Sequence, residues 1–154
     1  MIQRIQSVYL ALAAVMMGLM FVFPLGDFLG GIERFHLTPT GLYSSEGVRV
    51  AQTLPMAMLS VVATLLPLVV IFLYRDRRLQ MRLCVAEMIL LFGEQLMVCL
   101  WLWRSLRSMS GFSPCGYHFS VASALPIVAF VVVWLAMKSI ARDEALVRSV
   151  DRIR

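Results

Sequence analysis

Long apolar stretches separated by short polar segments dominate the chain. A helix needs about 20 residues to cross the roughly 30 Å of hydrocarbon in a bilayer. By this measure the sequence predicts four membrane-spanning segments, at residues 5–26, 50–74, 83–103 and 119–137. Because lipid offers no partner for backbone hydrogen bonds, each segment is expected to be a helix.

The basic residues are divided unequally between the two sides of such a membrane protein. The N-terminus, the second loop and the C-terminal tail together hold ten of them: Arg4, Arg75, Arg77, Arg78, Arg82, Lys138, Arg142, Arg148, Arg152 and Arg154. The opposite side holds four, namely Arg34, Arg49, Arg104 and Arg107. Cytoplasmic loops carry the excess of Lys and Arg, so both termini are predicted to be cytoplasmic.

The predicted fold is therefore all-α, an integral membrane four-helix bundle that forms one domain over residues 1–154. The fourth helix is expected to continue as a cytoplasmic tail over 138–154, where opposite charges recur at helical spacing. The outer segment 27–49 is long for a bare loop. Its partly alternating stretch Glu33–Thr38 is compatible with a short hairpin.

Composition supports a lipid environment. Hydrophobic residues make up 60% of the chain and charged residues 15%, whereas soluble domains are nearer half and a quarter. A small soluble fold could not bury that much apolar surface, so the bilayer is the expected partner. The net charge of +5 would also suit nucleic acid, but no basic run is interleaved with stacking aromatic residues. We therefore expect no nucleic-acid partner.

Two carboxylates in the third span are the strongest candidate functional residues. Glu87 and Glu94 are seven residues apart, so they share one helix face about 10 Å from each other. An ionised carboxylate deep in a membrane is costly, so Glu94 must be neutral, paired or open to water. Either Glu94 bonds a neighbouring helix while Glu87 reaches the interface near Arg82, or both take part in proton coupling. Because Arg82 is close to Glu87, the structural alternative is favoured for Glu87. For Glu94, both the structural role and proton coupling remain open.

Small residues form a ridge along the first span. They recur every three or four positions, a spacing that lets a second helix approach closely. The predicted packing seam consists of Ser7, Ala11, Ala14 and Gly18.

Cysteine and histidine residues do not form a recognisable site. No zinc-binding or catalytic motif is present, so neither an enzyme nor a metal or cofactor is expected. A bridge between Cys99 and Cys115, both toward the outer side, is the alternative to free thiols.

Three pieces of sequence are similar to a known family. They are the opening residues 1–10 (MIQRIQSVYL), the inner turn 77–84 (RRLQMRLC) and the closing residues 141–154 (ARDEALVRSVDRIR). The chain resembles, over nearly its whole length, a family of small four-span membrane proteins of unknown function from Bacteroidetes. That resemblance implies four spans and an inner-membrane location, and it supplies no activity or catalytic residues.

The resemblance and the charge pattern direct attention to the cytoplasmic side. The leading hypothesis is a non-enzymatic inner-membrane protein that binds a membrane protein partner, or its own copies, through a basic cytoplasmic face. The alternative is a small proton-coupled transporter or channel that uses Glu94 and Glu87. The predicted cytoplasmic face comprises Arg77, Arg78, Arg82, Arg142, Asp143, Glu144, Arg148, Asp151 and Arg152.

Overall fold

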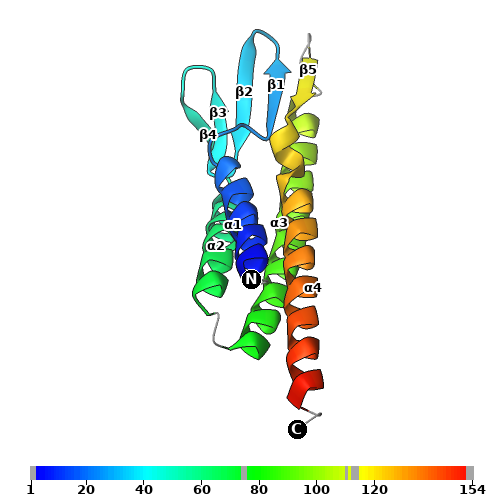
Figure 1. The fold of residues 1–154 in the computed structure, drawn as a ribbon. Coiled ribbons are helices and arrows are strands. Elements are labelled where there is room, and N and C mark those ends of the chain that lie inside the picture. Colours follow the sequence, from blue (N-terminus) through cyan, green and yellow to red (C-terminus); the bar gives the residue numbers. More distant parts are fainter. Residues whose placement is uncertain (1–2, 74–75, 110, 112–114, 152–154) are drawn as a thin grey trace.

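A computed structural model describes residues 3–73, 76–109, 111 and 115–151. Four helices lie side by side, and a β-sheet covers the end of the bundle that is away from both chain termini (Figure 1). The helices are α1 (Gln3–Leu19), α2 (Leu54–Phe72), α3 (Arg77–Met109) and α4 (Leu125–Asp151), the last preceded by a 3-10 turn at Val121–Ala124.

The sheet corrects the expectation of an all-α fold. Its strands are β1 (Gly26–Gly30), β2 (Glu33–Thr38), β3 (Gly41–Ser44), β4 (Arg49–Gln52) and β5 (Cys115–Phe119). They pair antiparallel in the order β4-β3-β2-β1-β5. The segment predicted to be an outer loop thus forms a four-stranded meander instead of one hairpin. The fifth strand comes from the segment that joins α3 to α4.

Two prolines explain why the second and fourth helices begin later than the predicted spans. Residues 50–52 belong to β4, and α2 begins at Leu54 with Pro55 in its first turn. Likewise Phe119 ends β5, and α4 begins at Leu125 with Pro126 next. Proline lacks an N–H and has a helical φ, so it favours the start of a helix.

Three of the helical segments are long and apolar enough to cross a membrane: Leu54–Phe72, Arg77–Ser108 and Val121–Ala145. The first helix contains a shorter apolar segment, Ile5–Leu19. It ends in a turn, after which the Leu25 amide already donates to the Leu37 carbonyl of the sheet at 2.7 Å. The predicted span 5–26 was therefore too long at its C-terminal end.

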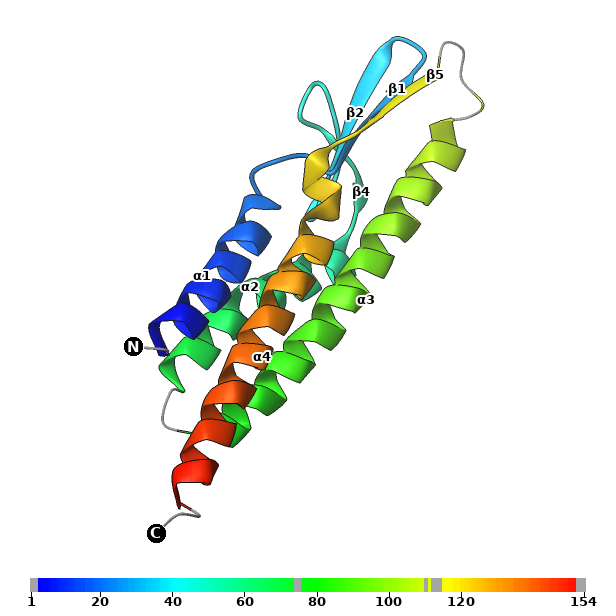
Figure 2. The same ribbon diagram turned by 45° about the vertical axis from the view of Figure 1, so that its right-hand side comes forward.

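One continuous core joins the helices and the sheet. Helix α1 packs against α2 and α4, and α3 packs against the same two helices (Figure 2). Phe28, Leu37 and Leu42 of the sheet are buried with the apolar residues of the bundle. The Thr53 hydroxyl, at the start of α2, donates to the Pro39 carbonyl at 2.6 Å. This bond holds the sheet to the bundle.

Candidate functional site

Polar side chains line the face of α3 that points into the bundle. Positions on this face follow one another at intervals of three or four residues, as one side of a helix requires. In the described chain they alternate with apolar Leu91 and Val98, which are equally buried. The buried polar members are Gln80, Glu87, Glu94 and Ser105, and the Cys84 thiol is buried on the same face.

Glu94 makes a hydrogen bond to the neighbouring helix. Its side chain has no exposed surface, and its Oε1 lies 2.5 Å from the Ser60 hydroxyl of α2. Ser60 Oγ also lies 2.9 Å from the Met56 carbonyl one turn earlier. A hydroxyl has one proton, so both contacts are hydrogen bonds when Glu94 carries a proton and donates it to Ser60. Oε2 has no hydrogen-bond partner among the described residues.

Glu87 is the more unusual of the two carboxylates. It is 1% exposed, and neither of its oxygens has a hydrogen-bond partner in the described part of the chain. The expectation that it reaches the cytoplasmic interface is therefore wrong. Position 87 falls on the same face as Cys84 and Leu91, and ten helical residues, about 15 Å, separate it from Arg77 at the start of α3.

The helices opposite these carboxylates present no basic side chain at the buried positions that the structure describes. On α2 those positions are Met56, Ser60, Ala63, Pro67 and Val70. The buried positions of α1 and α4 are apolar except for Gln6 and Asp143, near the ends of these helices away from the sheet. Burial costs a carboxylate several kcal/mol unless a cation or hydrogen bonds compensate. The site can therefore hold neutral carboxyls at a lower cost than charged ones.

A second polar group closes the end of the bundle opposite the sheet. The Gln6 amide of α1 donates to Asp143 Oδ2 of α4, and both side chains are buried. Arg77 Nη1 donates to the Asp143 carbonyl at 3.3 Å, and Arg78 Nε lies 3.9 Å from Glu144 Oε1. The inner turn and α4 are thus linked.

These contacts divide the predicted cytoplasmic face. Asp143 points inward, which corrects its assignment to that face, whereas Arg78, Arg82 and Arg142 are exposed. The side chains of Arg148 and Asp151, and all of Arg152, lie outside the described part of the structure.

The small-residue ridge of α1 is not an internal seam. Ala14 is buried, but Ala11 is exposed, and a Cβ added at Gly18 would meet nothing within 4 Å. Ser7 is half-buried. The face of α1 that packs inside the bundle is one position away and consists of Gln6, Leu10, Ala13 and Met17.

Cys99 is an exposed free thiol, so the alternative of a Cys99–Cys115 bridge is not realised. Cys84 is also free and is buried beside Glu87.

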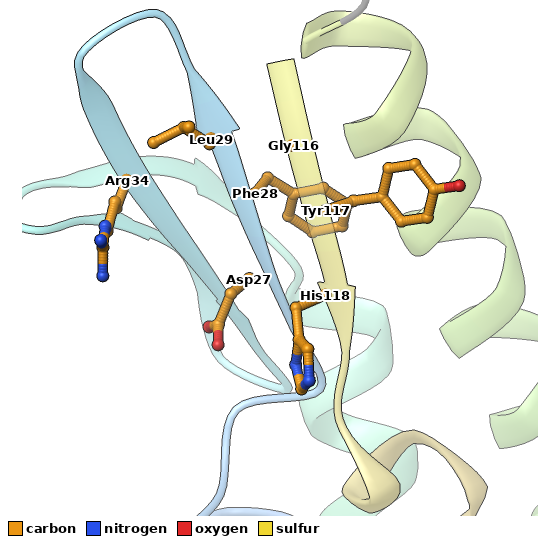
Figure 3. Close-up of a pocket in the computed structure, with 7 residues that line it drawn as sticks. All are labelled: Asp27, Phe28, Leu29, Arg34, Gly116, Tyr117 and His118. Carbon is orange, nitrogen blue, oxygen red and sulfur yellow. The ribbon is translucent and has the colours of Figure 1, made fainter. Parts of the chain in front are cut away.

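The sheet carries a polar row that the sequence did not reveal. Asp27 of β1 is in register with His36 of β2 and with His118 of β5. His36 Nδ1 lies 2.6 Å from Asp27 Oδ1. Asp27, Arg34 and His118 border a shallow hollow of about 300 Å³ (Figure 3). The searched residues contain no group of three side chains placed to hold a metal ion. This row could not be anticipated, because β5 was expected to be part of the connection to the fourth span.

Comparison with known families gives one match. Residues 2–153 match a family described as a domain of unknown function (DUF4293). No curated protein is significantly similar to the chain.

Proposed function

The chain belongs to the DUF4293 family, and we propose that this member is a four-span protein of the bacterial inner membrane that binds protons at Glu87 and Glu94. Both termini are cytoplasmic in this proposal, and the sheet is periplasmic. The protons bound at the two carboxyls drive coupled transport or conduction.

The exposed surface of the helices supports membrane embedding. Large apolar side chains cover the outside of all four, including Val15 of α1, Leu65 of α2, Phe92 of α3 and Val131 of α4. Soluble proteins rarely expose contiguous apolar surface of this extent. Helix α1 alone is only about 26 Å long, and the exposed residues Phe21–Phe23 extend its apolar surface toward the sheet.

The positions of charged and aromatic residues support the orientation. Near the sheet, the Arg107 guanidinium lies 4.5 Å from the centre of the Trp103 ring, and Arg104 lies 5.7 Å from that of Trp101. Tryptophan and arginine are typical of a membrane–water interface. The opposite end has the larger share of basic residues, which favours the cytoplasm there.

Glu87 is the observation on which the proton-binding proposal rests. A buried carboxyl without a hydrogen-bond partner is rare in proteins, and inside membranes such groups commonly mark proton or ion pathways. Glu94 alone would not favour this function, because its hydrogen bond to Ser60 gives this buried carboxyl a structural role. Glu87 and Glu94 lie on one face of α3, about 10 Å apart. Neither a single water molecule nor a side-chain movement bridges that distance. The proposal therefore includes a second conformation in which water enters between α2 and α3.

Proton flux in reconstituted vesicles tests this function. We expect wild-type protein to dissipate an imposed pH gradient, Glu87→Gln to abolish that flux, and Glu94→Gln to reduce it strongly. Glutamine keeps the shape of the side chain and removes the titrating group. The control Glu46→Gln changes an exposed carboxylate in the turn between β3 and β4 and should leave the flux unchanged. Equal flux in wild type and Glu87→Gln would exclude the proposal.

The cytoplasmic face supports a second candidate function, binding of a partner protein or of a second copy. The contacts of Arg77 and Arg78 with α4 place the inner turn beside the helical tail, so their basic residues share one surface. A photo-crosslinker at the exposed position Ala145 should capture a protein partner in cells, while one at Val48, in the exposed turn between β3 and β4, should not. Capture of lipid alone at position 145 would contradict this candidate.

A further inference from the structure

A groove runs between α1 and α4 at the end of the bundle away from the sheet. Its volume is about 410 Å³. Two cations, two hydroxyls and two aliphatic side chains line it: Lys138, Arg142, Tyr9, Ser139, Ile5 and Leu135. The two helices are neighbours along this stretch (Figure 2).

The two cations of the groove are available to a ligand. Lys138 and Arg142 are one helical turn apart, so their side chains lie on the same side of α4. Neither forms an ion pair within the described chain. Asp143 also borders the groove, but one of its carboxylate oxygens accepts from Gln6 and its side chain is 9% exposed. Positive charge therefore dominates the opening.

The depth of the groove matches the level of lipid headgroups under the proposed orientation. Lys138 Nζ lies 5.1 Å from the centre of the Trp134 ring, and Tyr9 is on the facing helix. Such aromatic residues gather where acyl chains meet headgroups. Leu135 and Ile5 provide apolar contacts, while Ser139 and Tyr9 can donate hydrogen bonds to phosphate oxygens.

We propose that this groove binds the phosphate headgroup of an anionic phospholipid from the cytoplasmic leaflet. Lys138 and Arg142 neutralise the phosphate, Tyr9 and Ser139 donate to its oxygens, and one acyl chain lies along Leu135 and Ile5. Basic pockets between helices on the cytoplasmic side suit such lipids. The inference rests on the proposed membrane orientation and is independent of proton binding.

Quenching of Trp134 by brominated lipids tests the site. Trp134 is 42% exposed, and replacing Trp101 and Trp103 with phenylalanine makes it the sole tryptophan. In this background we expect brominated phosphatidylglycerol to bind about tenfold more tightly than brominated phosphatidylcholine. The double variant Lys138→Gln/Arg142→Gln should lose that preference, and Lys138→Arg should keep it. The control Arg78→Gln/Arg82→Gln removes the same charge from the same end outside the groove and should change the preference less than about twofold.

Each of the other outcomes leads to a different conclusion. Equal quenching by the two lipids, or equal loss of preference in both double variants, would overturn the lipid site and leave the membrane orientation intact. Displacement of phosphatidylglycerol by millimolar inorganic phosphate would instead identify a free-phosphate site and contradict the lipid assignment. Absence of quenching by either lipid would contradict the membrane location itself.

Discussion

Replacement of Glu87 with leucine is expected to stabilise the folded protein by about 1–3 kcal/mol. The carboxyl is buried, and neither oxygen has a hydrogen-bond partner among the described residues, so folding or insertion must remove it from water without compensation. Leucine has a similar volume and needs no partner. The free energy of unfolding in mixed detergent micelles measures this effect.

The matched control is the same substitution at Glu94, two helical turns further along α3. There the carboxyl bonds Ser60, so its loss removes a favourable contact together with the burial cost. We expect Glu94→Leu to change the free energy of unfolding by less than about 1 kcal/mol. A marked destabilisation by Glu87→Leu would mean that Glu87 is hydrogen-bonded or hydrated in the folded protein, which contradicts the environment described above.

Replacement of Asp143 with alanine is expected to destabilise the protein by about 2–4 kcal/mol. The change leaves the buried Gln6 amide without its acceptor and opens a cavity between α1 and α4. Thermal or detergent-induced unfolding of the purified protein measures the loss.

An exposed residue at the same end of the bundle gives a control for this second prediction. The side chain of Arg78 is 80% exposed and its Nε lies 3.9 Å from Glu144 Oε1, and exposed ion pairs contribute about 0–1 kcal/mol. Arg78→Ala should therefore have a much smaller effect than Asp143→Ala. The double variant Gln6→Leu/Asp143→Leu should be more stable than the sum of its single changes implies, because it leaves no unpaired polar group. Simple additivity would argue against the Gln6–Asp143 bond.

Much of the helical part could be predicted because it depends on local physics. Twenty apolar residues in a row form a helix wherever lipid surrounds them, so α2, α3 and α4 were recognisable from the sequence alone. Their ends were less accurate because Pro55 and Pro126 act as helix starts in one context and as kinks in another. The match over residues 2–153 shows that the chain belongs to a family of unknown function, as its terminal and inner-turn residues predicted.

The sheet and the environment of Glu87 depend on long-range contacts that the sequence does not display. Strand β5 has only five residues, too few for its alternation to identify a strand, and is stabilised by pairing with β1, almost ninety positions earlier in the chain. Because Glu87 is near Arg82 in sequence, the sequence favours a Glu87 side chain that extends to the membrane interface. Its actual direction follows from the helix face it shares with Leu91 and Glu94, which α2 and α4 cover.

Accessibility of single cysteines from the two sides of the membrane tests the central claim, a four-span protein with cytoplasmic termini. Cys84, Cys99 and Cys115 are replaced by alanine, and one cysteine is introduced either at Ser45, in the exposed turn between β3 and β4, or at Ser149, late in α4. An impermeant maleimide added to intact spheroplasts should label position 45 and should label position 149 only after lysis. Labelling of position 149 in intact spheroplasts, or labelling of neither position until lysis, would contradict the proposed orientation.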